Sequence, residues 1–210
     1  VLVPVAERVF GPEHKGDIIY EGHFRRPFTG NEAEGLRNFG PDYHLTLRGM
    51  TGHAVGKSFT RQGHNMVVSI HRPKLDGPGL METEPAPGLA LLHFEGLTPL
   101  HWVVKLLRKA RAFAHANGMQ PTVHRQRQID TIAAKPEAAF ALHDRLKRID
   151  DTQRTAFAGL NLLQTAAFLP NEAIAQIFPG LRIDLTPHTV DSWIWDRHAE
   201  ILQTAGFSRS

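Results

Sequence analysis

Two pairs of cationic side chains are spaced so that each pair shares one face of an expected element. Lys57 and Arg61 stand four residues apart in an expected strand, where such positions point to the same side. Lys105 and Arg108 stand three residues apart in an expected helix, which also places them on one face. A paired cationic face can bind a phosphate or another anion, and it can equally be a solvated surface. Both interpretations stay open for each pair.

Residues 52–58 read Gly-His-Ala-Val-Gly-Lys-Ser, which invites comparison with a phosphate-binding loop. That loop needs four residues between its glycines, because this length lets the backbone N–H groups wrap a phosphate. Here three residues separate Gly52 from Gly56, and Thr51 stands where the first glycine belongs. Residues 59–63 are typical of a strand and a turn rather than of the helix that should follow. The spacing therefore argues against a phosphate loop.

The chain has 13 histidines and no cysteine. His53, His64 and His71 lie too far apart to form a local metal-binding motif, and thiolate metal sites and disulfides are excluded. Ser58 lacks the glycine that follows the nucleophile of a hydrolase elbow. The chain also has no Asp-x-Asp motif. Any chemistry at these histidines must therefore depend on residues that are distant in the sequence.

The composition is that of an ordinary globular protein. Of the 210 residues, 41% are hydrophobic and 21% are charged, which is enough for a real core. The formal charge of +3 is compatible with peripheral contact with a membrane surface. No nucleic-acid-binding signature is present, so we expect no nucleic-acid partner. No apolar run approaches the roughly 18 residues of a membrane span, so we expect no transmembrane segment. The absence of cysteine is compatible with a cytoplasmic location.

The hydrophobic pattern changes near residue 96. Before it, short apolar runs bounded by Gly, Pro and His predict strands at 17–20, 66–70 and 89–94. After it, Thr98 and Pro99 are a natural helix start, and apolar residues recur every three or four positions up to Gly118. Further helices are expected at 136–149, 151–168, 171–177 and 191–205. We predict an α/β chain in which residues 96–210 form an all-helical C-terminal region.

Four segments in a fixed order carry a resemblance to a known family. The first segment is Phe10-Gly11, which precedes an expected short strand, and the second is residues 56–61, which contain Lys-Ser and then Arg. The third is residues 70–73, which contain His-Arg-Pro. The fourth is His93-Phe94, which precedes an expected amphipathic helix with Trp, Lys and Arg. Together they resemble the second half of family 2-like bacterial glycosyltransferases of the GT-A type, which are related to family 92. The resemblance covers residues 9–110. This chain departs from it at two places: the family has Trp before its Phe-Gly segment, and it has Tyr at the position of Phe94.

The resemblance implies that residues 1–95 are the C-terminal part of a GT-A-like core with a mixed sheet, and that 96–210 are a helical extension. It implies a partner that lies upstream of Val1, namely the N-terminal half of the same protein with its Asp-x-Asp. The parent protein would move a sugar from a nucleotide-sugar donor to a polysaccharide or lipid-linked glycan acceptor in bacterial polysaccharide biosynthesis, and the fragment alone would be inactive.

In such a transfer, a divalent metal and cationic side chains stabilise the departing diphosphate, and a carboxylate can accept the proton of the acceptor hydroxyl. The expected cofactor is Mg²⁺ or Mn²⁺. Tryptophans at 102, 193 and 195 suit either sugar stacking or helix packing. The alternative is a non-catalytic basic helical module that binds an anionic glycan or protein partner. The resemblance assigns His93 and His71 to the metal, Glu21 to the base, and Lys57, Arg61, Phe10, Gly11, Lys105 and Arg108 to substrate binding.

Overall fold

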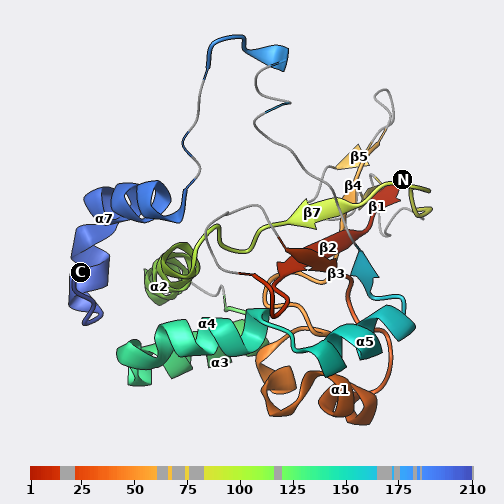
Figure 1. Cartoon of the computed structure of the whole chain (residues 1–210), viewed down its shortest axis with the longest axis horizontal. Helices are drawn as coiled ribbons and strands as arrows, with labels where there is room; N and C mark the ends of the chain where they lie inside the picture. The colour runs from red at the N-terminus through yellow and green to blue at the C-terminus, as the bar shows by residue number, and fades with distance from the viewer. Residues whose placement is uncertain are drawn as a thin grey trace.

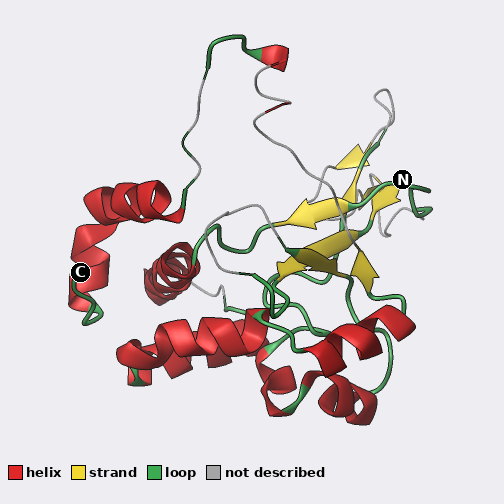
Figure 2. Ribbon diagram, in the orientation of Figure 1, coloured by secondary structure: helices red, strands yellow, loops and turns green. Residues whose placement is uncertain are grey.

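The structure is a computed structural model that describes residues 1–14, 22–60, 66–67, 74–75, 83–115, 120–164, 172, 176–181, 184 and 186–209. Within these ranges it is a mixed α/β protein with short strands and longer helices, as the sequence predicts (Figures 1 and 2). The described helices include none with the length and apolar character needed to cross a membrane.

The largest sheet has four strands in the order β7-β2-β3-β8. Strand β2 (Val5–Val9) is parallel to β7 (Leu91–His93) and antiparallel to β3 (His23–Arg25), which pairs with β8 (Leu163–Gln164). Two small antiparallel sheets pair β1 (Leu2–Val3) with β4 (Lys57–Ser58), and β5 (Met66–Val67) with β6 (Lys74–Leu75). The sheet is mixed, which agrees with the expectation for the first part of the chain.

Every residue of β2 is buried, so both faces of this central strand are covered. Because side chains alternate along a strand, Glu7 points to one covered face and Arg8 to the other. The apolar residues on either side, Val5 and Val9, are 3% and 0% exposed. The fold thus forces two charged side chains into the interior.

The helices gather in two groups around this sheet (Figure 1). Helices α1 (Glu32–Phe39) and α5 (Asp151–Gly159) lie side by side near β3 and β8, and the short helix η1 (Pro41–Leu45) follows α1. Helices α2 (Pro99–His115), α3 (Val123–Ala134) and α4 (Ala139–Lys147) enclose a core around Trp102, with the short helix η2 (Pro136–Ala138) before α4. Helix α7 (Pro187–Thr204) packs on the outer side of α2.

The predicted start of α2 is confirmed. Helix α2 begins at Pro99, and the Thr98 hydroxyl accepts a hydrogen bond from the His101 N–H at 3.1 Å. This cap satisfies one of the N–H groups that a helix start leaves unpaired. The signal is local, which is why the sequence alone could predict it.

Other boundaries differ from the predictions. The helix expected at 151–168 ends at Gly159, and Leu163–Gln164 instead adds strand β8 to the main sheet, so the region after residue 96 is not all-helical. The last helix begins at Pro187 with Thr186 as its cap, before the expected Asp191. Helices α1 and α3 and strand β2 were not predicted. The strand expected at 17–20 and most of the helix expected at 171–177 lie outside the described residues.

Candidate functional site

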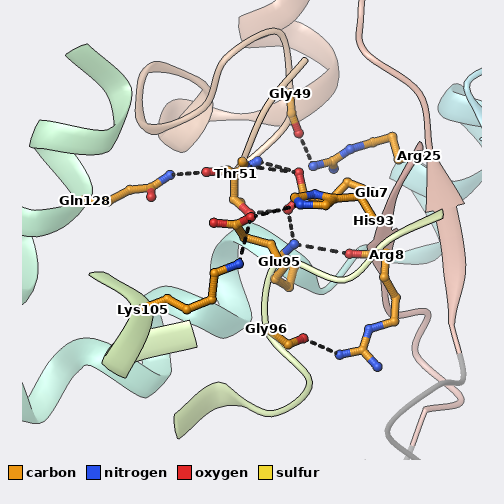
Figure 3. Close-up of polar contacts among 12 residues, drawn as sticks. Glu7, Arg8, Arg25, Gly49, Thr51, His93, Glu95, Gly96, Lys105 and Gln128 are labelled. Atoms are coloured by element: carbon orange, nitrogen blue, oxygen red, sulfur yellow. Dashed lines mark hydrogen bonds and ion pairs between the residues drawn. The ribbon is translucent and has the colours of Figure 1, made fainter. Parts of the chain in front are cut away.

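The Glu7 carboxylate is the centre of a buried polar cluster. Glu7 is fully buried on β2, and it accepts hydrogen bonds from the N–H and the hydroxyl of Thr51 and from the N–H of Gly52. Figure 3 shows Thr51 beside the Glu7 carboxylate. Lys147, at the last turn of α4, forms an ion pair with the same carboxylate. The backbone amides of the glycine-containing segment after Thr51 therefore hold a carboxylate of the chain itself rather than a phosphate.

A second buried carboxylate follows the end of β7. Arg125 of α3 donates a hydrogen bond to Glu95 at 2.5 Å, and Lys105 of α2 places its ammonium 3.3 Å from the other oxygen of that carboxylate. His93 Nε2 lies 3.4 Å from this second oxygen as well. Strand β7 and helices α2 and α3 therefore meet at Glu95.

Charge compensation keeps both carboxylates ionised. Burial disfavours the charged form of Glu7, but Lys147 and the hydrogen bonds from Lys147 and Thr51 outweigh it, so the pKa of Glu7 lies below its usual value. Burial likewise opposes ionisation of Glu95, yet Arg125 and Lys105 lower its pKa to about 2. Three cations face two carboxylates, which leaves a net positive charge.

His93 and Lys105 are the two members of this cluster that reach the surface. His93 is the last residue of β7, and its side chain is 25% exposed, whereas that of Glu95 is 2% exposed. Its Nδ1 is buried and has no hydrogen-bond partner among the described residues. Burial lowers the pKa of His93, which favours the neutral imidazole, the form that can bind a metal or accept a proton.

The structure brings together only some of the residues assigned from the sequence. His93 and Lys105 meet at Glu95, as described above. Lys57 lies half-buried on β4, in a different sheet, and Arg108 lines a separate cavity of about 370 Å³ between α2 and α7. The assignments to Glu21, Arg61 and His71 fall outside the described residues.

Phe10 and Gly11 directly follow β2, at the end of the sheet where the parallel strand β7 also ends. The Phe10 ring stacks on His14 at 4.3 Å, and Gly11 is buried. Of the three tryptophans, Trp102 is fully buried in the helical core, so the packing interpretation holds for it, while Trp193 is 54% exposed beside Arg197.

Sequence reasoning missed the residues that build the cluster: Glu7, Thr51, Glu95, Arg125 and Lys147. One signal was available, because Glu7 and Arg8 interrupt an apolar run that reads Val-Leu-Val-Pro-Val-Ala before them and Val-Phe after them. Charges inside such a run are placed in the interior when the run becomes a central strand. Nothing local predicts their partners.

Gly52 leaves the space in which this cluster packs. A Cβ atom at this position would lie 2.6 Å from Glu95 Oε2 and 2.8 Å from His93 Cε1. We expect Gly52→Ala to lower the free energy of unfolding by about 1–3 kcal/mol, because overpacking forces the neighbouring side chains out of place. Urea unfolding would measure this, with Gly159→Ala as the control, because a Cβ at Gly159 meets no atom within 4 Å. Equal stability of the two variants would refute the close packing.

Comparisons of the chain with models of protein families, with curated proteins and with solved structures find no match in any of the three.

Proposed function

We propose that this chain contributes the acceptor side of a glycosyltransferase, which moves a sugar from a nucleotide-sugar donor to a glycan acceptor. The observation that carries the proposal is the position of His93. It ends a strand parallel to the central strand, it is partly exposed, and it lies beside Glu95 and the ammonium of Lys105. Polar groups at the carboxyl end of such strands are well placed to meet a ligand.

The charge of the cluster suits the departing group. In the transfer, the acceptor hydroxyl attacks the anomeric carbon, the bond to the diphosphate breaks, and negative charge develops on the diphosphate. Fixed cations lower the energy of that charge without reorganising during the reaction. Lys105 is the exposed member of the cluster's cations, with 30% of its side chain accessible, whereas Arg125 and Lys147 are each 4% exposed. We assign the contact with the diphosphate to Lys105.

The buried carboxylates do not serve as the base in this proposal. Glu7 is fully buried and Glu95 is held by two cations. Both are therefore positioning residues, which fix Lys105, Lys147 and Arg125. The base stays assigned to Glu21 as a prediction.

The predicted metal is supported by one ligand only. The described residues contain no group of three His, Asp or Glu side chains that converge as a metal site, and His93 alone cannot hold Mg²⁺ or Mn²⁺, which take about six mainly oxygen ligands. The proposed chemistry therefore rests on the cationic side chains, and the metal stays a separate prediction.

The full-length encoded protein should release nucleoside diphosphate from at least one nucleotide sugar when Mn²⁺ and an acceptor glycan are present. We expect His93→Ala to lower this turnover by about 100-fold, because His93 is the predicted metal ligand and a bound metal would stabilise the charge that develops in the transition state. The free energy of unfolding should change by less than about 1 kcal/mol, because the ring is partly exposed and its Nδ1 has no hydrogen-bond partner in the described part of the chain.

The exposed His44→Ala is the matched control and should leave turnover unchanged. The proposal fails if no nucleotide sugar is turned over under any metal, or if His93→Ala destabilises the protein and leaves turnover intact.

A binding module is the second candidate, because one observation favours it. Arg108, Arg111 and Arg197 line the cavity of about 370 Å³ between α2 and α7, where an anionic glycan or an acidic protein segment could bind. Glu200 also lines it and pairs with Arg111 at 3.2 Å, which leaves an excess of positive charge. The turnover assay separates the two candidates, since a binding module consumes no donor.

A further inference from the structure

A small cavity of about 80 Å³ lies on the side of β2 opposite the Glu7 carboxylate. Arg8 and Phe10 contribute from β2 and its end, and His143 and Arg148 from α4 and the residue that follows it. The first residues of α2 and α7, Pro99 and Pro187, complete its wall. The cavity is therefore formed by four elements that are distant in the sequence.

Arg8 is a buried cation without a counter-ion among the described residues. Its side chain turns away from the carboxylates toward Gly96 (Figure 3), and Nη2 donates hydrogen bonds to the carbonyls of Gly96 and Leu97 at 2.7 and 2.9 Å. The other terminal nitrogen, Nη1, is buried with no hydrogen-bond partner. Arg8 is 3% exposed, and burial lowers its pKa to about 10, so it is still charged at neutral pH. The rings of Phe10 and Phe94, with centroids 4.7 and 5.0 Å from the guanidinium carbon, offset part of the cost of burying this charge. An anion would offset more of it.

The ends of two helices add positive potential at the same place. Helices α2 and α7 have 17 and 18 residues, and neither has an acidic residue in its first turn. The N-terminus of a helix carries about half a positive charge and favours anions. Arg148 is exposed at the rim and adds a full charge.

Two carboxylates oppose an anion. The Asp144 carboxylate also lines the cavity, with 59% of its side chain exposed. His143 adds no charge at neutral pH, because burial and the neighbouring Lys147 and Arg8 lower its pKa to about 3. The Asp191 carboxylate lies close by, because it accepts a hydrogen bond from the hydroxyl of Thr98 in the cavity wall. Two guanidinium groups and two helix N-termini thus stand against two carboxylates, and the balance is weakly positive.

We infer that this cavity binds the phosphate group of a small phosphorylated molecule. A phosphate has the small size, the double charge and the several acceptor oxygens that the cavity can satisfy. The cavity shares Pro99 and Asp144 with an adjoining cleft of about 420 Å³, which Trp195, His188 and Ser192 also line. An aromatic face among polar side chains suits a sugar ring, so the ligand class is a sugar phosphate.

The test measures binding of inorganic phosphate and of glucose 1-phosphate by calorimetry at pH 7 and low salt. We expect millimolar binding of phosphate, and Arg148→Gln should weaken it by about fivefold, the effect of about 1 kcal/mol for one exposed charge. Asp144→Asn should tighten it by about threefold, because it removes one of the two opposing charges. The control is Arg145→Gln on the same helix, whose side chain pairs with Asp42 outside the cavity and which should change binding by less than about twofold.

The two probes separate the sources of the phosphate group. If glucose 1-phosphate binds more tightly than inorganic phosphate, and Trp195→Ala removes this difference in affinity, the ligand is a sugar phosphate. If both probes bind equally, the site recognises the phosphate group alone. The inference is overturned if neither probe binds at a concentration of about 10 mM, since a dissociation constant of that size corresponds to a binding free energy of only about 3 kcal/mol. It is also overturned if Arg148→Gln and Asp144→Asn both bind phosphate with the affinity of the unchanged protein. The variants at Arg148 and Asp144 alter exposed side chains, so we expect both to fold and their binding to be measurable. No donor turnover is involved, so the outcome is independent of the proposed transfer.

Discussion

Replacing Glu7 with Gln should lower the free energy of unfolding by about 3–5 kcal/mol, because removing one partner of a buried ion pair leaves the other charge uncompensated. The side chains of Glu7 and Lys147 are 0% and 4% exposed. Glutamine keeps an oxygen that can accept the hydrogen bonds from Thr51 and Gly52, so the effect reports mainly on the Lys147 charge. Urea unfolding followed by circular dichroism measures it.

The double variant Glu7→Gln with Lys147→Met should recover most of that loss, because it removes the stranded charge and keeps the volume of the side chain. The control is Glu13→Gln, since Glu13 forms exposed ion pairs with His23 and Arg154, and its change should stay below about 1 kcal/mol. If the two substitutions at the buried pair act additively, Glu7 and Lys147 are not coupled as the structure indicates.

Acidification should destabilise the protein, and His143 should account for a large part of the effect. Burial, with the nearby Lys147 and Arg8, lowers the pKa of His143 from 6.5 to about 3. Below pH 6.5 the unfolded chain binds a proton at this residue and the folded chain does not, so stability falls as the pH falls. From pH 7 to pH 5 the expected loss at this one residue is about 2 kcal/mol, at about 1.4 kcal/mol for each pKa unit. The loss continues down to pH 3.

His143→Phe tests this directly. Phenylalanine keeps an aromatic ring against Trp102, whose centroid lies 5.5 Å from that of His143, and it cannot take up a proton. The slope of stability against pH between 7 and 5 should become shallower by about 1 kcal/mol per pH unit. The exposed His44→Phe is the control and should keep the slope of the unchanged protein. An unchanged slope in His143→Phe would show that His143 is accessible to protons in the folded state.

The same comparison separates His143 from the other buried groups. Burial also lowers the pKa of His93, His101 and His124, so some slope remains in His143→Phe. Glu95, with its pKa lowered from 4.5 to about 2, contributes stability that is present above pH 4.5 and is lost as the pH falls toward 2. Measurements at pH 5 and above therefore report on the histidines.

What the sequence by itself determined was local. Thr98 and Pro99 predicted the start of α2, because a cap and the first turn involve residues only three or four apart. The short apolar run at 89–94 predicted a strand, and the structure places β7 at Leu91–His93. The change of hydrophobic period near residue 96 predicted a mixed α/β chain, because each period reflects which side of one element is buried.

The tertiary structure alone decided which charges meet. Glu7 and Lys147 are 140 positions apart, and Glu95 and Arg125 are 30 apart, so no spacing rule connects them. Leu163–Gln164 became a strand because the edge of β3 offered it backbone hydrogen bonds, although the preceding pattern favoured a helix. Burial of Glu7 and Arg8 follows from the central place of β2 in the sheet, which depends on long-range pairing. Charges in the interior are tolerated only where distant partners meet them, and that meeting is a property of the folded chain.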